Sequence, residues 1–272
     1  MRLKTRIASV PYIIWMIVFI IVPLVIVCYY AFTTRDGTFT LDNVSNIGQY
    51  QHVFARSIWL AVLATAICLV VAFPLAYIIS RLSGSRQRFA VMLIMLPMWI
   101  NFLLRTYAWM SLLENNGLIN RFFGLIGLGP FQMINTPGAV VLGMVYNFLP
   151  FMILPLYSVM TKIDDSVINA AQDLGANMWN VTARVIIPLS VPGITTGFTM
   201  VFVPSISTFA ISQLLGGGNV YLIGDLIDLQ FSGASYNPNL GSAMALVLMV
   251  IVLLLMSIAT QFDNEEMEGM LI

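Results

Sequence analysis

Six apolar stretches, each long enough to cross a lipid bilayer, follow one another along the chain. A spanning helix needs about 20 mostly apolar residues, because about 30 Å of hydrocarbon must be covered at 1.5 Å of rise per residue. The stretches lie near residues 9–31, 58–80, 89–112, 138–160, 189–215 and 240–261. The first is longer than the apolar core of a secretory signal and has no small-residue cleavage site after it, which indicates a retained anchor. The pattern predicts an all-α integral membrane bundle of six transmembrane helices, with residues 1–272 forming one domain.

Composition supports this prediction and excludes several classes of function. Hydrophobic residues make up 59% of the chain and charged residues 9%, far from the balance of a soluble domain. Twelve Lys and Arg balance twelve Asp and Glu, and no basic stripe is present, which argues against a nucleic-acid partner. Cys28 and Cys68 lie in apolar runs, where a thiol behaves as a small hydrophobe. His52 is the only histidine and has no cysteine nearby, so no metal site is predicted.

Basic residues predict the orientation of the chain, since Lys and Arg are enriched in cytoplasmic loops. With the N-terminus inside, eight of them fall on the cytoplasmic side and four on the other side or at the outer end of the third stretch. The eight are Arg2, Lys4, Arg6, Arg81, Arg86, Arg88, Lys162 and Arg184, and the four are Arg35, Arg56, Arg105 and Arg121. Both termini are therefore expected in the cytoplasm.

The loop between the fourth and fifth stretches, at about residues 161–188, is amphipathic. Asp164, Asp165 and Ser166 are favourable residues at the start of a helix. An apolar stripe follows at helical spacing, and Gly175 occupies the position of a left-handed cap. The stripe consists of Val167, Ala170, Ala171 and Leu174. The loop is predicted to form a short helix, a glycine turn, and a second helix over about 177–186.

This loop has two interpretations. An amphipathic helix can lie on the lipid surface, but such helices usually carry basic residues on the polar face and large aromatic residues on the apolar face. The first predicted helix has neither. Its stripe centres on two alanines, and small residues let another backbone approach closely. The loop is therefore interpreted as a docking element for another protein.

The loop resembles the EAA loop of permease subunits of bacterial ABC importers of the type I fold. That pattern reads Glu-Ala-Ala, three residues, Gly, nine residues, Ile, one residue, Leu-Pro. Ala170, Ala171, Gly175 and Pro188 match its spacing, whereas Asn169 stands where Glu is usual. The resemblance implies the type I permease fold, with this loop coupling the chain to an ATPase. The replacement by Asn169 removes any ion pair that the usual Glu would make with the ATPase.

Three further segments are similar to the spermidine/putrescine permease subgroup: NFLLRTYAW at 101–109, LPLYSVM at 154–160 and LIGDLIDLQF at 222–231. The resemblance implies a multi-pass protein of the bacterial inner membrane that imports polyamines by alternating access. It also implies four kinds of partner besides lipid. These are a second permease, two ATPase subunits, an extracytoplasmic solute-binding protein and the polyamine itself. An importer of another small solute remains an alternative.

Nothing in the sequence predicts an enzyme or a cofactor. No phosphate-binding G-x-x-x-x-G-K-[ST] motif is present, so ATP hydrolysis is expected on a partner chain. No Ser, His and Asp set suggests a nucleophile, and no catalytic residue is proposed. A secondary transporter driven by an ion gradient is a further alternative, but such proteins usually show inverted repeats and more ionisable residues within the membrane.

Two groups of residues could meet a solute. Asp225 and Asp228 share one face of a short helix, and Tyr221 and Phe231 lie nearby, a combination that suits an alkylammonium ion. The alternative for this group is a solvated face that contacts the binding protein. Arg105, expected three quarters of the way along the third stretch, is interpreted as a structural anchor with a possible influence on gating, or as a residue that reaches the outer interface.

Overall fold

A computed structural model describes residues 10–233 and 236–269 of the chain. In these ranges the regular structure is helical, with one isolated bridge between Thr33 and Phe39. The first helices, including π and 3₁₀ turns (η), are η1 (Ile17–Ile21), α2 (Val22–Ala31), α3 (Asp42–Ser45), η2 (Asn46–Tyr50), α4 (Gln51–Ser80), α5 (Gly84–Met95), η3 (Leu96–Trp99), α6 (Phe102–Leu113) and α7 (Leu118–Leu125). They are followed by α8 (Pro137–Met160), α9 (Asp165–Asp173), α10 (Met178–Val181), η4 (Thr182–Ile186), α11 (Ile187–Ser207), α12 (Ala210–Gly216), α13 (Ile223–Ser232) and α14 (Pro238–Gly269).

The expected transmembrane content is confirmed, with changes at two of the six stretches. Within the described residues, five helical segments are long and apolar enough to cross a membrane, and a bent pair provides a sixth if it is counted as one span. The five are Val10–Ala31, Asp42–Ser80, Pro137–Met160, Met178–Ser207 and Pro238–Ala259.

Contacts divide the chain into two units. One comprises Met1–His52 with Leu226–Leu253, and the other comprises Val53–Asp225 with Leu254–Ile272.

In the first unit, side chains tie the beginning of α14 to the loop after α2. Asn239 Nδ2 donates to the carbonyl oxygens of Tyr30 at 3.1 Å and Thr33 at 2.7 Å. Arg35 Nη2 donates to the carbonyl oxygen of Tyr236 at 2.8 Å. The Tyr30 carbonyl lies in the last turn of α2, where carbonyl groups have no partner further along the helix.

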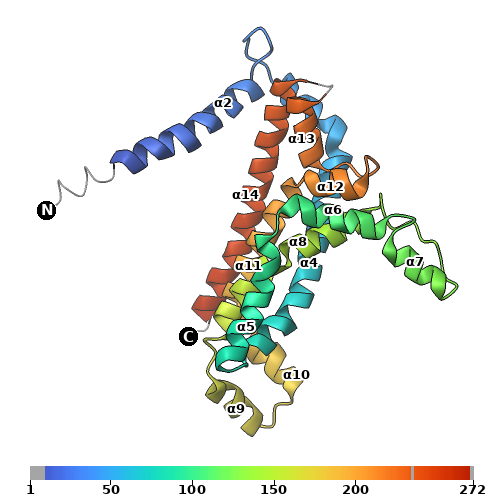
Figure 1. Ribbon diagram of the computed structural model, residues 1–272. Coiled ribbons are helices and arrows are strands. Elements are labelled where there is room, and N and C mark those ends of the chain that lie inside the picture. Colours follow the sequence, from blue (N-terminus) through green and yellow to red (C-terminus); the bar gives the residue numbers. More distant parts are fainter. Residues whose placement is uncertain (1–9, 234–235, 270–272) are drawn as a thin grey trace. The chain divides into compact units, whose positions relative to one another are not determined.

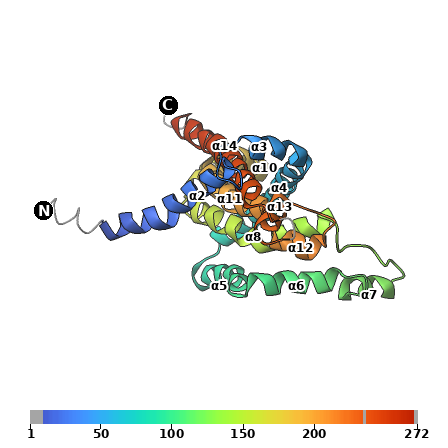
Figure 2. The same cartoon turned by 90° about the horizontal axis from the view of Figure 1, so that it is seen from above.

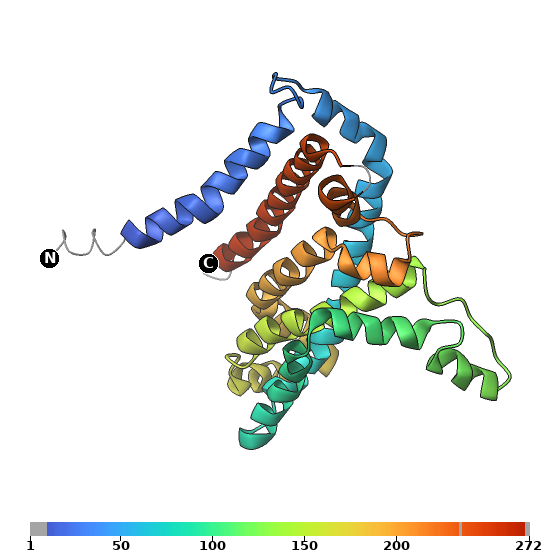
Figure 3. The ribbon, with the colours of Figure 1, turned by 45° about the horizontal axis from the view of Figure 1, so that its top comes forward.

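In the second unit, α8 and α11 pack closely along their length, as Figure 3 shows in yellow-green and gold. Gly193 and Gly197 are one turn apart on α11 and allow this approach. A Cβ atom on Gly193 would lie 3.1 Å from the carbonyl oxygen of Pro155 and 3.2 Å from Cα of Leu156. Without a large apolar driving force between helices in lipid, small residues that bring backbones together are the usual source of such packing.

The third stretch, expected near 89–112, is broken into two helices. Gly84–Trp99 and Phe102–Leu125 are bent by 88° at the break between them, and Figures 1 and 2 show α6 turning away from the direction of α5. Pro97 lies in the 3₁₀ turn η3, after which Ile100 is extended. Asn101 then starts a new helix, because its Oδ1 accepts from Leu103 N–H at 2.9 Å. The chain is apolar on both sides of the break, so the hydrophobic pattern does not reveal that one helix ends at Trp99 and another begins at Phe102.

The fifth stretch also ends earlier than expected. Its helix ends at Ser207 instead of continuing to 215, and α12 follows as a separate helix. Gly224 packs against the end of α11, where a Cβ atom would lie 2.6 Å from the carbonyl oxygen of Ser207 and 2.5 Å from that of Thr208. Thr208 is extended. The chain therefore leaves the helix where another backbone covers its final carbonyl groups.

Candidate functional site

The loop after α8 forms the short helix α9, as the sequence predicts. Asp164 is its N-cap, and Oδ1 accepts from Ser166 N–H at 2.8 Å. This bond to the backbone N–H favours the ionised carboxylate and holds the pKa of Asp164 below its usual range. In Figure 1, α9 and α10 lie beyond the end of α8 from which the loop emerges.

At the other end of α8, the carbonyl oxygen of Leu215, the next-to-last residue of α12, accepts from Asn135 N–H at 2.9 Å.

Gly175 ends the helix, as predicted. Its φ of +84° is in the left-handed region, which an L-residue adopts only at a cost. No atom lies within 4 Å of a Cβ built at this position, so the backbone angle and not the available space requires glycine. Ala176 N–H then donates to the carbonyl oxygen of Ala171 at 3.1 Å, which closes the end of α9.

The second helix of the loop does begin at the predicted place, but it does not stop before Pro188. Asn177 caps α10, its Oδ1 accepting from Asn180 N–H at 2.8 Å. The helix continues through the π turn η4 directly into α11, within the segment Met178–Ser207. Pro188 lies in the first turn of α11. The wider π turn accommodates a proline that cannot donate a backbone bond.

Three of the four residues of the predicted stripe on α9 are exposed, and the buried residue of this helix, Ile168, lies outside the stripe. Ile168 is buried and Ala171 is half-buried against the core of the second unit. Val167 and Ala170 are exposed, and Leu174 is 90% exposed. One face of the helix is therefore held by this chain while a neighbouring apolar face remains uncovered. Asn169, at the position of the family Glu, is also exposed.

A groove of about 360 Å³ separates the end of α9 from the beginning of the following helix. It is lined by Ala171, Leu174, Gly175, Ala176, Asn180, Val181, Arg184 and Val185. Trp179, next to it in sequence, is 78% exposed. Together with the outward face of α9, these residues form a surface that is apolar except at Asn180 and Arg184, of the kind that docks another protein.

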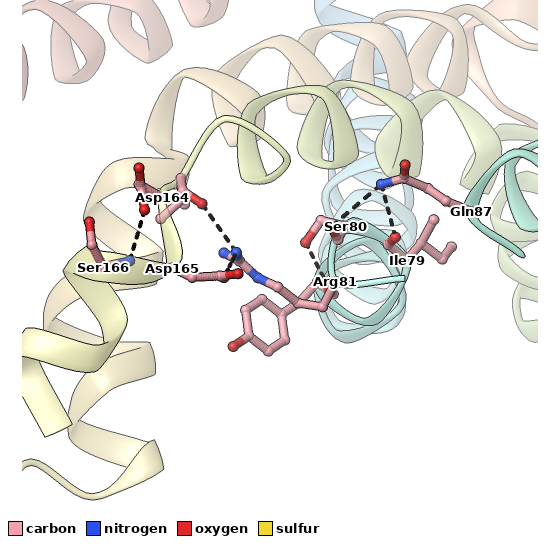
Figure 4. Close-up of polar contacts among 9 residues, drawn as sticks. Ile79, Ser80, Arg81, Gln87, Asp164, Asp165 and Ser166 are labelled. Atoms are coloured by element: carbon pink, nitrogen blue, oxygen red, sulfur yellow. Dashed lines mark hydrogen bonds and ion pairs between the residues drawn. The ribbon is translucent and has the colours of Figure 1, made fainter. Parts of the chain in front are cut away.

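Sequence reasoning missed the residue that attaches this loop to the rest of the unit. Arg81 follows α4 directly and forms an ion pair with Asp165, 84 residues away (Figure 4). Its Nη1 also donates to the carbonyl oxygen of Ile163 at 3.1 Å. In the sequence, Arg81 serves only as a marker of orientation. No local pattern connects residues this far apart in sequence.

The residues predicted to meet a solute do not share one environment. Asp225 is 2% exposed, and its Oδ2 accepts from Leu222 N–H at 2.7 Å, so it helps to begin α13. Asp228 is half-buried, and Tyr221 and Phe231 are exposed. Arg105 does not lie far along a straight span: it is in the first turns of α6, directly after the break, where its N–H donates to the carbonyl oxygen of Asn101.

Comparison with solved structures shows the fold. The structure aligns with TM-score 0.76 to a chain of the bacterial ABC transporter that imports the acidic polysaccharide alginate. The alignment covers 96% of this chain and 95% of that one, at 17% sequence identity. The transporter has also been solved in complex with a periplasmic protein that carries an alginate pentasaccharide. The helical arrangement is therefore that of an ABC importer permease.

Sequence comparison shows the family. The chain is 36% identical over 269 residues to the spermidine/putrescine transport system permease protein PotB of Haemophilus influenzae, covering 93% of each. It is 34% identical to PotB of Escherichia coli, covering 93% of this chain and 97% of that one. Residues 72–265 match the model of the binding-protein-dependent transport system inner membrane component. These residues include the coupling-loop pattern and most of the predicted spans, and the chain therefore belongs to this family of transport permeases.

Proposed function

We propose that this chain is the permease subunit of an ATP-driven importer of polyamines, spermidine or putrescine, and forms half of the translocation path. The observation that carries this proposal is the exposed apolar face of α9, outside the core of its own unit and at the position of the coupling-loop pattern. The names of the relatives that it matches over 93% of its length support the solute class.

The partners follow from what the chain lacks. Its sequence has no phosphate-binding motif, so a pair of ATPase subunits must supply the work. A second, homologous permease completes the path, and an extracytoplasmic binding protein delivers the solute. Both termini and the loop at 161–188 face the cytoplasm, an assignment supported by the distribution of Lys and Arg.

The geometry of the loop suits the transfer of motion. A short amphipathic helix with apolar anchors at i, i+3 and i+7 can lie in a groove of a partner, as Val167, Ala170 and Leu174 of α9 would. The cap at Asp164 and the turn at Gly175 fix both ends of that helix. Closure of the ATPase dimer would then move α9 as a rigid body and switch the path between its two orientations.

The docking assignment is tested by Ala170→Arg in a tagged chain. Arginine on the outward face should prevent the ATPase from co-purifying, because a charge would be forced into an apolar contact. Gln172→Arg is the matched control, since Gln172 is exposed and lies about 200° around the helix from Ala170. If the ATPase co-purifies equally with both variants, the docking face is elsewhere.

Tyr221, Asp225 and Asp228 are the proposed contacts with the solute. An alkylammonium is held by carboxylates and by the faces of aromatic rings. Because Asp225 also supports the start of α13, Asp228→Asn is the cleaner substitution. It should raise the KM of polyamine uptake while the subunits still assemble. An unchanged KM would exclude Asp228 from the path.

A further inference from the structure

Arg81, the residue directly after α4, contacts residues at the beginning of α9. Arg81 forms the ion pair with Asp165 and donates to the carbonyl oxygen of Ile163, and its guanidinium lies 5.4 Å from the centre of the Tyr77 ring. Figure 4 shows this side chain reaching from the last turn of α4 to the first residues of the loop. Arg81 therefore contacts Tyr77 of α4 and the two residues that flank Asp164, the N-cap of α9.

These contacts distinguish the pair from an ordinary surface ion pair, in which both partners are exposed and screened by water. The Arg81 side chain is only 24% exposed, whereas that of Asp165 is 76% exposed. Nε and Nη2 of Arg81 are buried and have no acceptor within the described residues. Asp165 is thus the carboxylate that compensates the burial of this guanidinium, and its removal would leave a partly buried charge without a counterion.

The same corner also contacts α5. Gln87 Nε2 donates to the carbonyl oxygens of Ile79 and Ser80, each at 3.4 Å. These are final carbonyl groups of α4, which have no partner within the helix. Figure 4 shows Gln87 approaching the end of α4 on one side, whereas the Arg81 side chain extends away from it on the other. The end of α4 is therefore held by α5 through one side chain and holds α9 through another.

We propose that Arg81 is a positioning residue that fixes the coupling loop to the end of α4, so that displacement of α9 by an ATPase moves α4 and α5 with it. This inference rests on the proposed function. Without the ion pair, α9 can still dock on the ATPase, but part of its movement is lost in the loop instead of reaching the helices. The result is ATP hydrolysis with less transport.

The test measures solute transported per ATP hydrolysed by the complete importer in proteoliposomes, for Arg81→Gln, Asp165→Asn and the double variant. Residues that couple two sites commonly contribute 0.5–2 kcal/mol, so each single variant should lower the ratio by about two- to thirty-fold. The double variant should lose no more than the worse single variant, because the two residues act through one contact. Arg86→Gln and Asp173→Asn are matched controls, both exposed and without a described ion pair, and should keep the ratio.

The outcomes separate this inference from the proposed function. An unchanged ratio for Asp165→Asn, or losses that add in the double variant, would overturn the positioning role. The exposed Asp165 keeps the experiment decisive even if Arg81→Gln fails to assemble. Failure of the unsubstituted importer to couple ATP hydrolysis to transport would instead contradict the proposed function. A loss of ATPase co-purification in Asp165→Asn would show that the residue serves docking and would also overturn the inference.

Discussion

At the scale of single residues, the two ends of α9 follow from local backbone chemistry. Asp164 accepts a backbone hydrogen bond at the start, and Gly175 adopts a left-handed conformation at the end. Both roles could be predicted because they depend on neighbours within four residues. The inward face of the helix could not be predicted, because which apolar residue is buried depends on distant packing: Ile168 is buried, while Leu174 is exposed.

The cap at Asp164 gives the loop a defined dependence on pH. A carboxylate whose pKa is lowered in the folded state contributes stability above its unfolded value, about 3.9, and loses it as the pH falls below that value. Hydrogen-exchange protection of the Ser166 amide should therefore stay constant between about pH 8 and 5. Asp164→Ala should lower this protection several-fold throughout the range, while Asp164→Asn, also a good cap, should keep it. Protection that already falls near pH 6 in the unsubstituted protein would contradict this role.

The turn at Gly175 gives a prediction that concerns backbone conformation alone. Gly175→Ala should cost about 1 kcal/mol, seen as a roughly fivefold lower exchange protection at the end of α9. Gly124→Ala is the control, because Gly124 in α7 has equally open space but no left-handed φ. If each substitution lowers exchange protection in its own helix by the same factor, the conformation of Gly175 is not what ends α9.

At the scale of elements, the sequence predicts the number and nature of the helices better than their continuity. Both arms of the third stretch are apolar, so hydropathy does not distinguish one straight helix from two that are bent by 88°. Pro97 and the capping residue Asn101 carried the signal for the break. The π turn that leads into Pro188 likewise joined two predicted helices. The contact between Arg81 and Asp165 had no signal in sequence, because the fold alone brings these residues together.

Close packing of α8 and α11 predicts different costs at different glycines. Gly193→Ala should destabilise the chain by about 1–3 kcal/mol, because its new methyl group would meet the backbone of α8, which cannot move aside alone. Gly138→Ala is the control, since the nearest atom to a Cβ there is the Thr136 hydroxyl at 3.7 Å. Denaturant unfolding in mixed micelles measures both. If Gly193→Ala is as stable as Gly138→Ala, the two helices do not depend on this close approach.

At the scale of the whole molecule, each unit combines apolar spans with polar joints at their ends. In the second unit, α9 projects beyond the end of α8 and is fixed by Arg81, while α12 packs against the other end of α8. The chain belongs to a family of binding-protein-dependent inner membrane components, and this division fits our proposal that the spans form a path and that the loop receives work from outside the chain. A secondary transporter would not need an uncovered helix in this place.

The most direct measurement is polyamine uptake into proteoliposomes that contain this chain, the second permease and the binding protein, with and without the ATPase subunits. The account predicts uptake only when the ATPase and ATP are both present, with no requirement for an ion gradient and with ATP turnover stimulated by spermidine or putrescine. Uptake driven by an ion gradient in vesicles that lack the ATPase would contradict it.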